Sequence, residues 1–65
     1  MNLLINGERR TVKSETIEQL IAELELNGHL LVVEMAGDII SREKWSDTPL
    51  SENKSIELVH FVGGG

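Results

Sequence analysis

The sequence predicts an α+β fold in which one main helix packs on one face of a four- to five-stranded mixed sheet. Three features carry this prediction: the turn signal Asn6-Gly7, a single amphipathic stretch at residues 17–24, and apolar segments at residues 30–35 and 55–62. The chain has 65 residues and no cysteine, so we expect one domain, residues 1–65, that folds without disulfides.

The first element is a hairpin. Leu3, Leu4 and Ile5 form a short apolar strand that ends at Asn6-Gly7, the strongest short hairpin signal, because a type I′ turn needs positive φ at both central residues. The returning strand, residues 8–13, is polar and basic and places mainly Val12 in the interior. Such a strand belongs at a sheet edge, where charge discourages pairing with another chain.

The helix follows the hairpin. Thr16 is the expected N-cap, and Gln19 stands at the third helical position, which completes a capping box. The apolar residues recur at i, i+3, i+4 and i+7 and form one stripe: Ile17, Leu20, Ile21 and Leu24. Asn27-Gly28 predicts a left-handed stop, which gives a helix of about ten residues that needs a sheet to pack on.

The second half of the chain supplies the remaining strands. Residues 30–35 are the most apolar segment and predict a central strand. Residues 36–38 form a turn before a short strand at residues 39–40. A polar stretch, residues 46–54, holds the only proline and predicts a connecting loop before a final strand at residues 55–62.

Residues 42–45 predict a single helical turn, pinned by the Trp45 indole as a plug on the sheet edge. The element order is therefore hairpin, helix, strand, short strand and last strand. This order is typical of the β-grasp, the ubiquitin-like plan in which the first and last strands lie side by side and parallel at the centre of the sheet.

The alternation of the last strand predicts a docking surface. Ile56 and Leu58 share one face, while Val59 and Phe61 share the other. If the helix covers the Ile56 side, Val59 and Phe61 point away from the core, as does Leu4 on the first strand. We expect these three to form a small apolar patch for a partner. The alternative is a slip of one residue, which would exchange the two faces.

The sharpest feature is the terminal Gly63-Gly64-Gly65. Without Cβ atoms, a glycine backbone can enter a narrow tunnel. Three residues at 3.3–3.6 Å each span roughly 10 Å. We therefore expect a flexible tail, residues 63–65, that delivers the Gly65 carboxylate into a partner's buried site. The alternative is a frayed end without a function.

A carboxylate resists nucleophiles until it is activated. ATP can convert it to an acyl-adenylate with AMP as leaving group, and an anionic sulfur nucleophile can then attack the carbonyl. The product on Gly65 would be a thioester, an acyl-disulfide or a thiocarboxylate. The glycine spacing permits this chemistry but does not establish it.

Charge and composition exclude several classes. The net charge of −5, with only Arg9-Arg10 as a basic pair, argues against nucleic acid. The acidic surface suits a basic partner, or serves solubility alone. No apolar run predicts a membrane span or signal peptide, so we expect a cytoplasmic protein. His29 and His60 stand far apart in a chain without cysteine, so neither an enzyme nor a metal or cofactor site is expected.

The sequence resembles the ThiS family, the sulfur carriers of thiamin biosynthesis. The likeness runs along the whole chain through the opening at residues 3–7, the helix start at residues 16–20, the segment 39–45 and the closing His60-Phe61-Val62-Gly63-Gly64-Gly65. Two connecting positions depart from the pattern: Ser41 where relatives often have proline, and Ala36 where they often have asparagine.

The resemblance implies that an E1-like adenylyltransferase (ThiF-like) uses ATP to adenylate Gly65, with Gly63 and Gly64 as the threading tail. A cysteine desulfurase or another donor then supplies sulfur, and the thiocarboxylate passes it to a thiazole synthase (ThiG-like). The chain itself would be a non-catalytic co-substrate. Three alternatives stay open: molybdopterin synthesis or another thiolation pathway, a ubiquitin-like protein modifier, and an interaction module with an inert tail.

Overall fold

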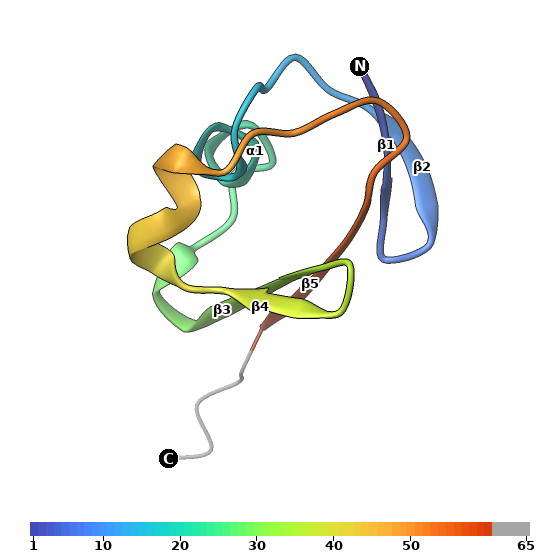
Figure 1. Ribbon diagram of the computed structural model, residues 1–65. Coiled ribbons are helices and arrows are strands. Elements are labelled where there is room, and N and C mark those ends of the chain that lie inside the picture. The colour runs from blue at the N-terminus through green and yellow to red at the C-terminus, as the bar shows by residue number, and fades with distance from the viewer. Residues whose placement is uncertain (61–65) are drawn as a thin grey trace.

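A five-stranded mixed sheet forms the body of the molecule in the computed structural model, which describes residues 1–60 (Figure 1). The strand order is β2-β1-β5-β3-β4, and the bounds are β1 Asn2–Ile5, β2 Glu8–Thr11, β3 Leu31–Met35, β4 Asp38–Ile40 and β5 Ser55–His60. The first and last strands, β1 and β5, are parallel neighbours, and every other pair is antiparallel. The predicted β-grasp arrangement is confirmed.

The hairpin forms as predicted. Asn6 has φ 52° and Gly7 has φ 82°, the positive pair that a type I′ turn requires. All four residues of β2 are exposed, so this strand lies at the sheet edge with its polar side chains in solvent. Val12, just after β2, is buried and supplies the apolar contact of this segment.

The helix α1, Ile17–Glu23, begins where the sequence predicts and ends earlier. Thr16 Oγ1 accepts a hydrogen bond from the backbone N–H of Gln19 at 3.2 Å. The Gln19 side chain reaches back to the backbone N–H of Glu15 at 2.8 Å, one residue before the N-cap. The left-handed residue that follows the helix is Glu25, with φ 55°.

The prediction that Asn27-Gly28 stops the helix is therefore wrong. Asn27 has φ −84° and caps a separate 3-10 turn, η1 (Gly28–Leu30), through its side-chain oxygen and the N–H of His29. Space at position 28 is tight: a Cβ there would lie 3.0 Å from Cζ3 of Trp45, closer than most Cβ contacts in proteins. The constraint is the long-range packing of an indole, which local sequence does not reveal.

The core lies between the sheet and the layer made by α1 and the 3-10 segment η2 (Arg42–Asp47), which lie on the same side of the sheet (Figure 1). Trp45 is buried, and its Nε1 donates to the carbonyl of Ile40 at 3.0 Å. The Arg42 guanidinium stacks over the indole at 5.5 Å. The helical turn is thus longer than predicted, and the indole pins it to β4.

Candidate functional site

The predicted reactive tail, residues 63–65, lies outside the described part of the chain. Gly63, Gly64 and Gly65, the predicted sulfur-carrying end, and Phe61, a predicted docking residue, lie outside residues 1–60. His60 is the last residue of β5 and pairs with Leu31 of β3. The described residues next to the predicted site are those that hold and surround the end of β5.

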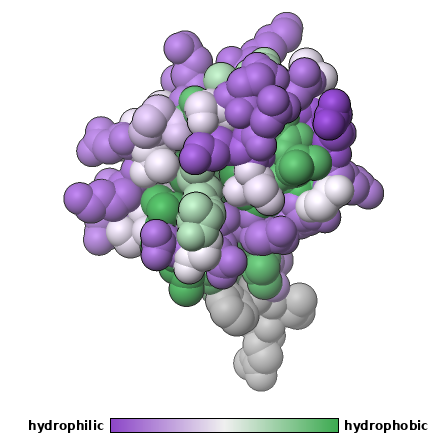
Figure 2. All heavy atoms as spheres, turned by 45° about the vertical axis from the view of Figure 1, so that its right-hand side comes forward, coloured by the Kyte–Doolittle hydropathy of each residue, from purple (hydrophilic) through white to green (hydrophobic). Residues whose placement is uncertain are grey.

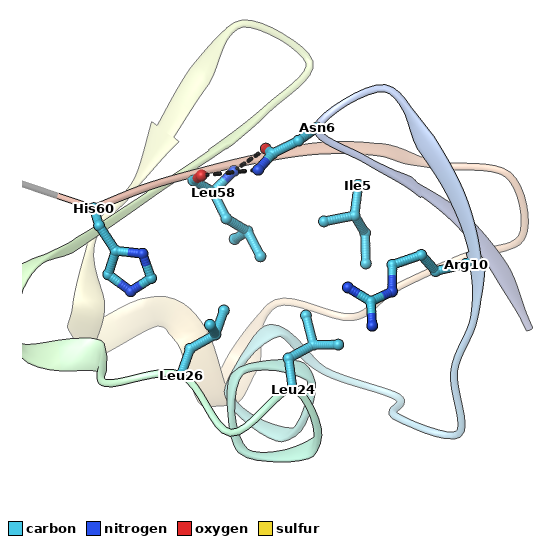
Figure 3. Close-up of a pocket in the computed structure, with 7 residues that line it drawn as sticks. All are labelled: Ile5, Asn6, Arg10, Leu24, Leu26, Leu58 and His60. Carbon is cyan, nitrogen blue, oxygen red and sulfur yellow. Dashed lines mark hydrogen bonds between the residues drawn. The ribbon is translucent and has the colours of Figure 1, made fainter.

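A side chain of the hairpin turn holds the last part of β5. The regular β1–β5 ladder pairs Leu4 with Ser55 and Ile5 with Ile56, and the N–H of Asn6 then donates to the carbonyl of Ile56. Beyond Ile56, the Asn6 side chain takes the place of β1 as the hydrogen-bonding partner of β5. Its Oδ1 accepts from the N–H of Leu58 at 2.7 Å, and its Nδ2 donates to the Leu58 carbonyl at 3.1 Å (Figure 3).

Asn6 thus has a second role that the sequence signal did not reveal. A turn asparagine is chosen for its positive φ, yet its amide also mimics a peptide unit and extends the parallel pairing by one step. The consequence is that β5 is held at Leu58 by Asn6 on one edge, while on its other edge it pairs with β3 as far as His60. The end of β5 is therefore positioned by one neighbouring strand, β3, and by a side chain of the hairpin turn.

A small hollow of about 170 Å³ lies under the end of β5, on the core side of the sheet. Its lining comes from the sheet and from the segment after α1: Ile5, Asn6, Arg10, Leu24, Leu26, Leu58 and His60. Figure 3 shows Arg10 and His60 entering from opposite sides, with Leu58 above the hollow and Leu24 and Leu26 below it. Cofactor sites typically measure roughly 300–1,000 Å³, so this hollow suits one side chain or a few waters.

The two faces of β5 are assigned without ambiguity. Ile56 is fully buried and Leu58 is 8% exposed, whereas Val59 is 50% exposed. A slip of one residue is therefore excluded. Leu4 also lies on the face away from the helix, because its neighbours Leu3 and Ile5 are buried.

The predicted single patch of Leu4 with Val59 does not form. Leu4 lies opposite Ser55, four residues before Val59, which is about 13 Å along a strand. The neighbour of Val59 is Val32, directly opposite on β3. Ile39 on β4 is 70% exposed on the same face. Sequence reasoning missed Val32 and Ile39 because strand pairing, not alternation, brings them next to β5.

Within residues 1–60, no three histidine, aspartate or glutamate side chains gather closely enough to bind a metal ion. None of the helices in this part of the chain is long and apolar enough to cross a membrane.

Together, the strand order, the parallel central pair and the single covering helix define a ubiquitin-like β-grasp domain whose last strand leads into a triglycine end. Comparison with known proteins narrows this class. The ThiS family profile matches residues 3–65. The chain belongs to the ThiS family, the sulfur carriers of thiamin biosynthesis.

The relatives agree with this assignment. The chain is 37% identical over 65 residues to the sulfur carrier protein ThiS of Bacillus subtilis, covering 97% of this chain and 98% of that protein. It is also 33% identical over 66 residues to a thiazole synthase of Magnetococcus marinus, where the match spans all of this chain and 20% of the synthase. The crystal structure of the thiamine biosynthesis protein ThiS from Geobacter metallireducens superposes with a TM-score of 0.84 at 29% identity, with both chains fully covered.

Proposed function

We propose that the Gly65 carboxylate carries sulfur as a thiocarboxylate and donates it to thiazole ring formation in thiamin biosynthesis. The observation that carries the proposal is the triglycine end, which begins three residues after His60, the last residue of the central strand of a ThiS-family β-grasp domain. The end of β5 is a fixed point of the fold, because β3 pairs with it as far as His60 and the Asn6 side chain bonds to it at Leu58. A slim tail leaving that point is suited to entering a catalytic tunnel.

Sulfur loading takes two substitutions followed by one reduction. A carboxylate oxygen attacks the α-phosphorus of ATP, pyrophosphate leaves, and the acyl-adenylate forms. A persulfide on a sulfur donor then attacks the carbonyl, AMP leaves, and the resulting acyl-disulfide is reduced by a thiol to the thiocarboxylate. ATP is a substrate of the partner adenylyltransferase, and this chain binds no cofactor of its own.

The chain acts as a co-substrate without catalytic residues, and its partners do the chemistry. We assign Gly65 as the sulfur-carrying residue and Gly63 with Gly64 as the threading tail. Val59, Phe61 and Leu4 are proposed docking residues, with Val59 and Leu4 in separate contacts, as their spacing on the sheet requires.

The partners are a ThiF-like adenylyltransferase, a cysteine desulfurase or other sulfur donor, and a ThiG-like thiazole synthase, all in the cytoplasm. The Magnetococcus marinus thiazole synthase supports the last of these, since a segment similar to this whole chain forms 20% of that protein. A carrier-like segment joined to a synthase in one chain is what a functional pairing of the two predicts.

The test is intact mass spectrometry after incubation with ATP, a sulfur donor and the cognate adenylyltransferase. We expect a gain of about 16 Da, the exchange of one oxygen for sulfur at an acyl group. The matched control is the chain without Gly64-Gly65, which should gain nothing. An unchanged mass for the full chain contradicts the proposal, and covalent conjugates to other proteins would instead indicate a protein modifier.

A further inference from the structure

Two asparagines of the chain are followed by glycine: Asn6 in the hairpin turn and Asn27 after α1. The backbone nitrogen of the residue after an asparagine can attack the side-chain carbonyl carbon, Cγ, and displace the side-chain nitrogen. A glycine at that next position favours the attack, because no Cβ hinders the approach of its nitrogen. The other two asparagines, Asn2 and Asn53, precede a leucine and a lysine. The chain therefore has two chemically labile Asn-Gly pairs.

The fold holds the Asn6 amide away from this reaction. Its Oδ1 accepts from the N–H of Leu58 at 2.7 Å, and its Nδ2 donates to the Leu58 carbonyl at 3.1 Å (Figure 3). Attack by the Gly7 nitrogen requires the Asn6 side chain to turn back onto its own backbone, so both bonds must break first. Asn6 is therefore reactive only when the hairpin turn opens away from β5.

The described residues give Asn27 no comparable long-range anchor. Its Oδ1 accepts one hydrogen bond, from the N–H of His29 at 2.9 Å, only two residues along the chain. That bond stabilises the same oxygen when it becomes negative during the attack. The nucleophile is the nitrogen of Gly28, the first residue of η1, whose N–H has no acceptor within that helix. The Gly28 carbonyl, which takes no part in the reaction, accepts from Arg42 and Leu31.

Solvent exposure does not distinguish the two asparagines. Both are exposed, and hydrophilic groups cover most of the surface in view in Figure 2. The difference lies in the hydrogen bonds, which tie Asn6 to a residue 52 positions away and Asn27 to one only two positions away. Two additional bonds to break lower the reactive fraction of Asn6 by a factor of about 5–150.

We propose that Asn27 is a site of spontaneous deamidation through a cyclic imide, and that the fold protects Asn6 from the same reaction. Hydroxide or a buffer base takes the proton of the Gly28 N–H as the bond from this nitrogen to Cγ forms. The bond from Cγ to Nδ2 breaks, and the nitrogen takes a proton from water and leaves as ammonia. Water then opens the imide at either carbonyl carbon, which gives aspartate or isoaspartate. This inference does not depend on the proposed function.

The two products have different consequences for the fold. Aspartate at position 27 keeps a capping oxygen for the N–H of His29. Isoaspartate instead routes the main chain through the side-chain carbon and lengthens it by one atom before Gly28. A Cβ on Gly28 would lie 3.0 Å from Cζ3 of Trp45, so a shift of this residue disturbs the packing of the indole. We therefore expect the isoaspartyl form to be less stable than the aspartyl form.

The experiment ages the protein in mildly alkaline buffer, once folded and once unfolded in guanidinium chloride. Digestion after lysine and arginine separates Asn6 and Asn27 into peptides 1–9 and 14–42, and each deamidation adds about 1 Da, the exchange of an amide nitrogen for oxygen. In the folded protein we expect residue 27 to convert about tenfold faster than residue 6, or more. In guanidinium chloride the two rates should agree within about threefold, because the bonds to Leu58 are absent. The matched control is Asn27→Ser, which keeps a capping oxygen, and its peptide 14–42 should gain no mass.

Three results would overturn the inference. These are equal conversion of residues 6 and 27 in the folded protein, a tenfold difference that persists in guanidinium chloride, and no conversion of residue 27 while the unfolded chain reacts. The aspartyl and isoaspartyl forms are then separated by chromatography and unfolded in urea, and equal midpoints would contradict the effect on Trp45. Sulfur loading adds about 16 Da, the exchange of oxygen for sulfur, so the mass assay tests the proposed function separately.

Discussion

Replacing Asn6 tests whether one turn side chain holds the end of the last strand. The Asn6 amide makes two hydrogen bonds to the backbone of Leu58, at 2.7 and 3.1 Å. At about 0.5–1.5 kcal/mol each, their loss costs about 1–3 kcal/mol. Alanine adds about 1 kcal/mol more, because Asn6 has φ 52°. The total is a large part of the roughly 3–10 kcal/mol expected for a domain of this size.

Asn6→Gly separates the two contributions, because glycine accepts the positive φ and removes only the hydrogen bonds. Urea unfolding followed by circular dichroism should show a loss of about 1–3 kcal/mol for glycine and a larger loss for Asn6→Ala. Asn6→Asp keeps the acceptor for the Leu58 N–H and removes the donor to its carbonyl, so we expect an intermediate loss. Native-state hydrogen exchange should show faster exchange of the Leu58 amide in the glycine variant.

One outcome would refute this role of the Asn6 side chain. If Asn6→Gly unfolds at the wild-type urea concentration and the Leu58 amide stays equally protected, then the side-chain bonds do not position the strand. In that case Asn6 serves only the turn, and the end of β5 is held by β3 alone.

Two further predictions concern stability. Ala36 occupies a left-handed position, with φ 53° before Gly37 at φ 84°. Asparagine tolerates this conformation better than alanine, so Ala36→Asn should raise the free energy of unfolding by about 0.5–1 kcal/mol in urea titration. A lower free energy of unfolding would contradict the idea that Ala36 is strained. Hydrogen bonds from the Ser14 hydroxyl and the Lys13 N–H hold the pKa of Glu23 below its ordinary value. The stabilisation is therefore fully present above the ordinary carboxyl pKa and is lost as pH falls through the lowered folded-state pKa. Thermal unfolding of Glu23→Gln should therefore show a deficit at pH 7 that closes in acid, and a deficit independent of pH would exclude this linkage.

Local patterns were enough where the physical cause is local. The Asn6-Gly7 turn needs only two positive φ angles, and the start of α1 needs only a capping oxygen at Thr16. Alternation on β5 also identified Ile56 as a core residue and Val59 as an outward one. These features depend on residues within one turn or one strand, so periodicity and turn chemistry predict them.

Predictions failed where distant segments meet. Gly28 looked like a helix stop, but it instead packs closely against the Trp45 ring. Leu4 and Val59 were predicted to form one patch, but the parallel register places Leu4 opposite Ser55, four residues before Val59 on β5. The role of Asn6 toward Leu58 spans 52 positions in the chain. Each case depends on which distant segment packs against the residue in question. A local sequence pattern does not contain that information.

The sequence by itself determined the β-grasp class, the buried face of β5 and the triglycine end, because hydrophobic period, turn residues and composition act over short distances. Only the tertiary structure decided that the Asn6 side chain hydrogen-bonds to the Leu58 backbone and that Glu34 lies opposite Glu57. The physical reason is that register is a property of pairs of strands: it is set when the whole core packs, and it then determines which side chains meet on the open face.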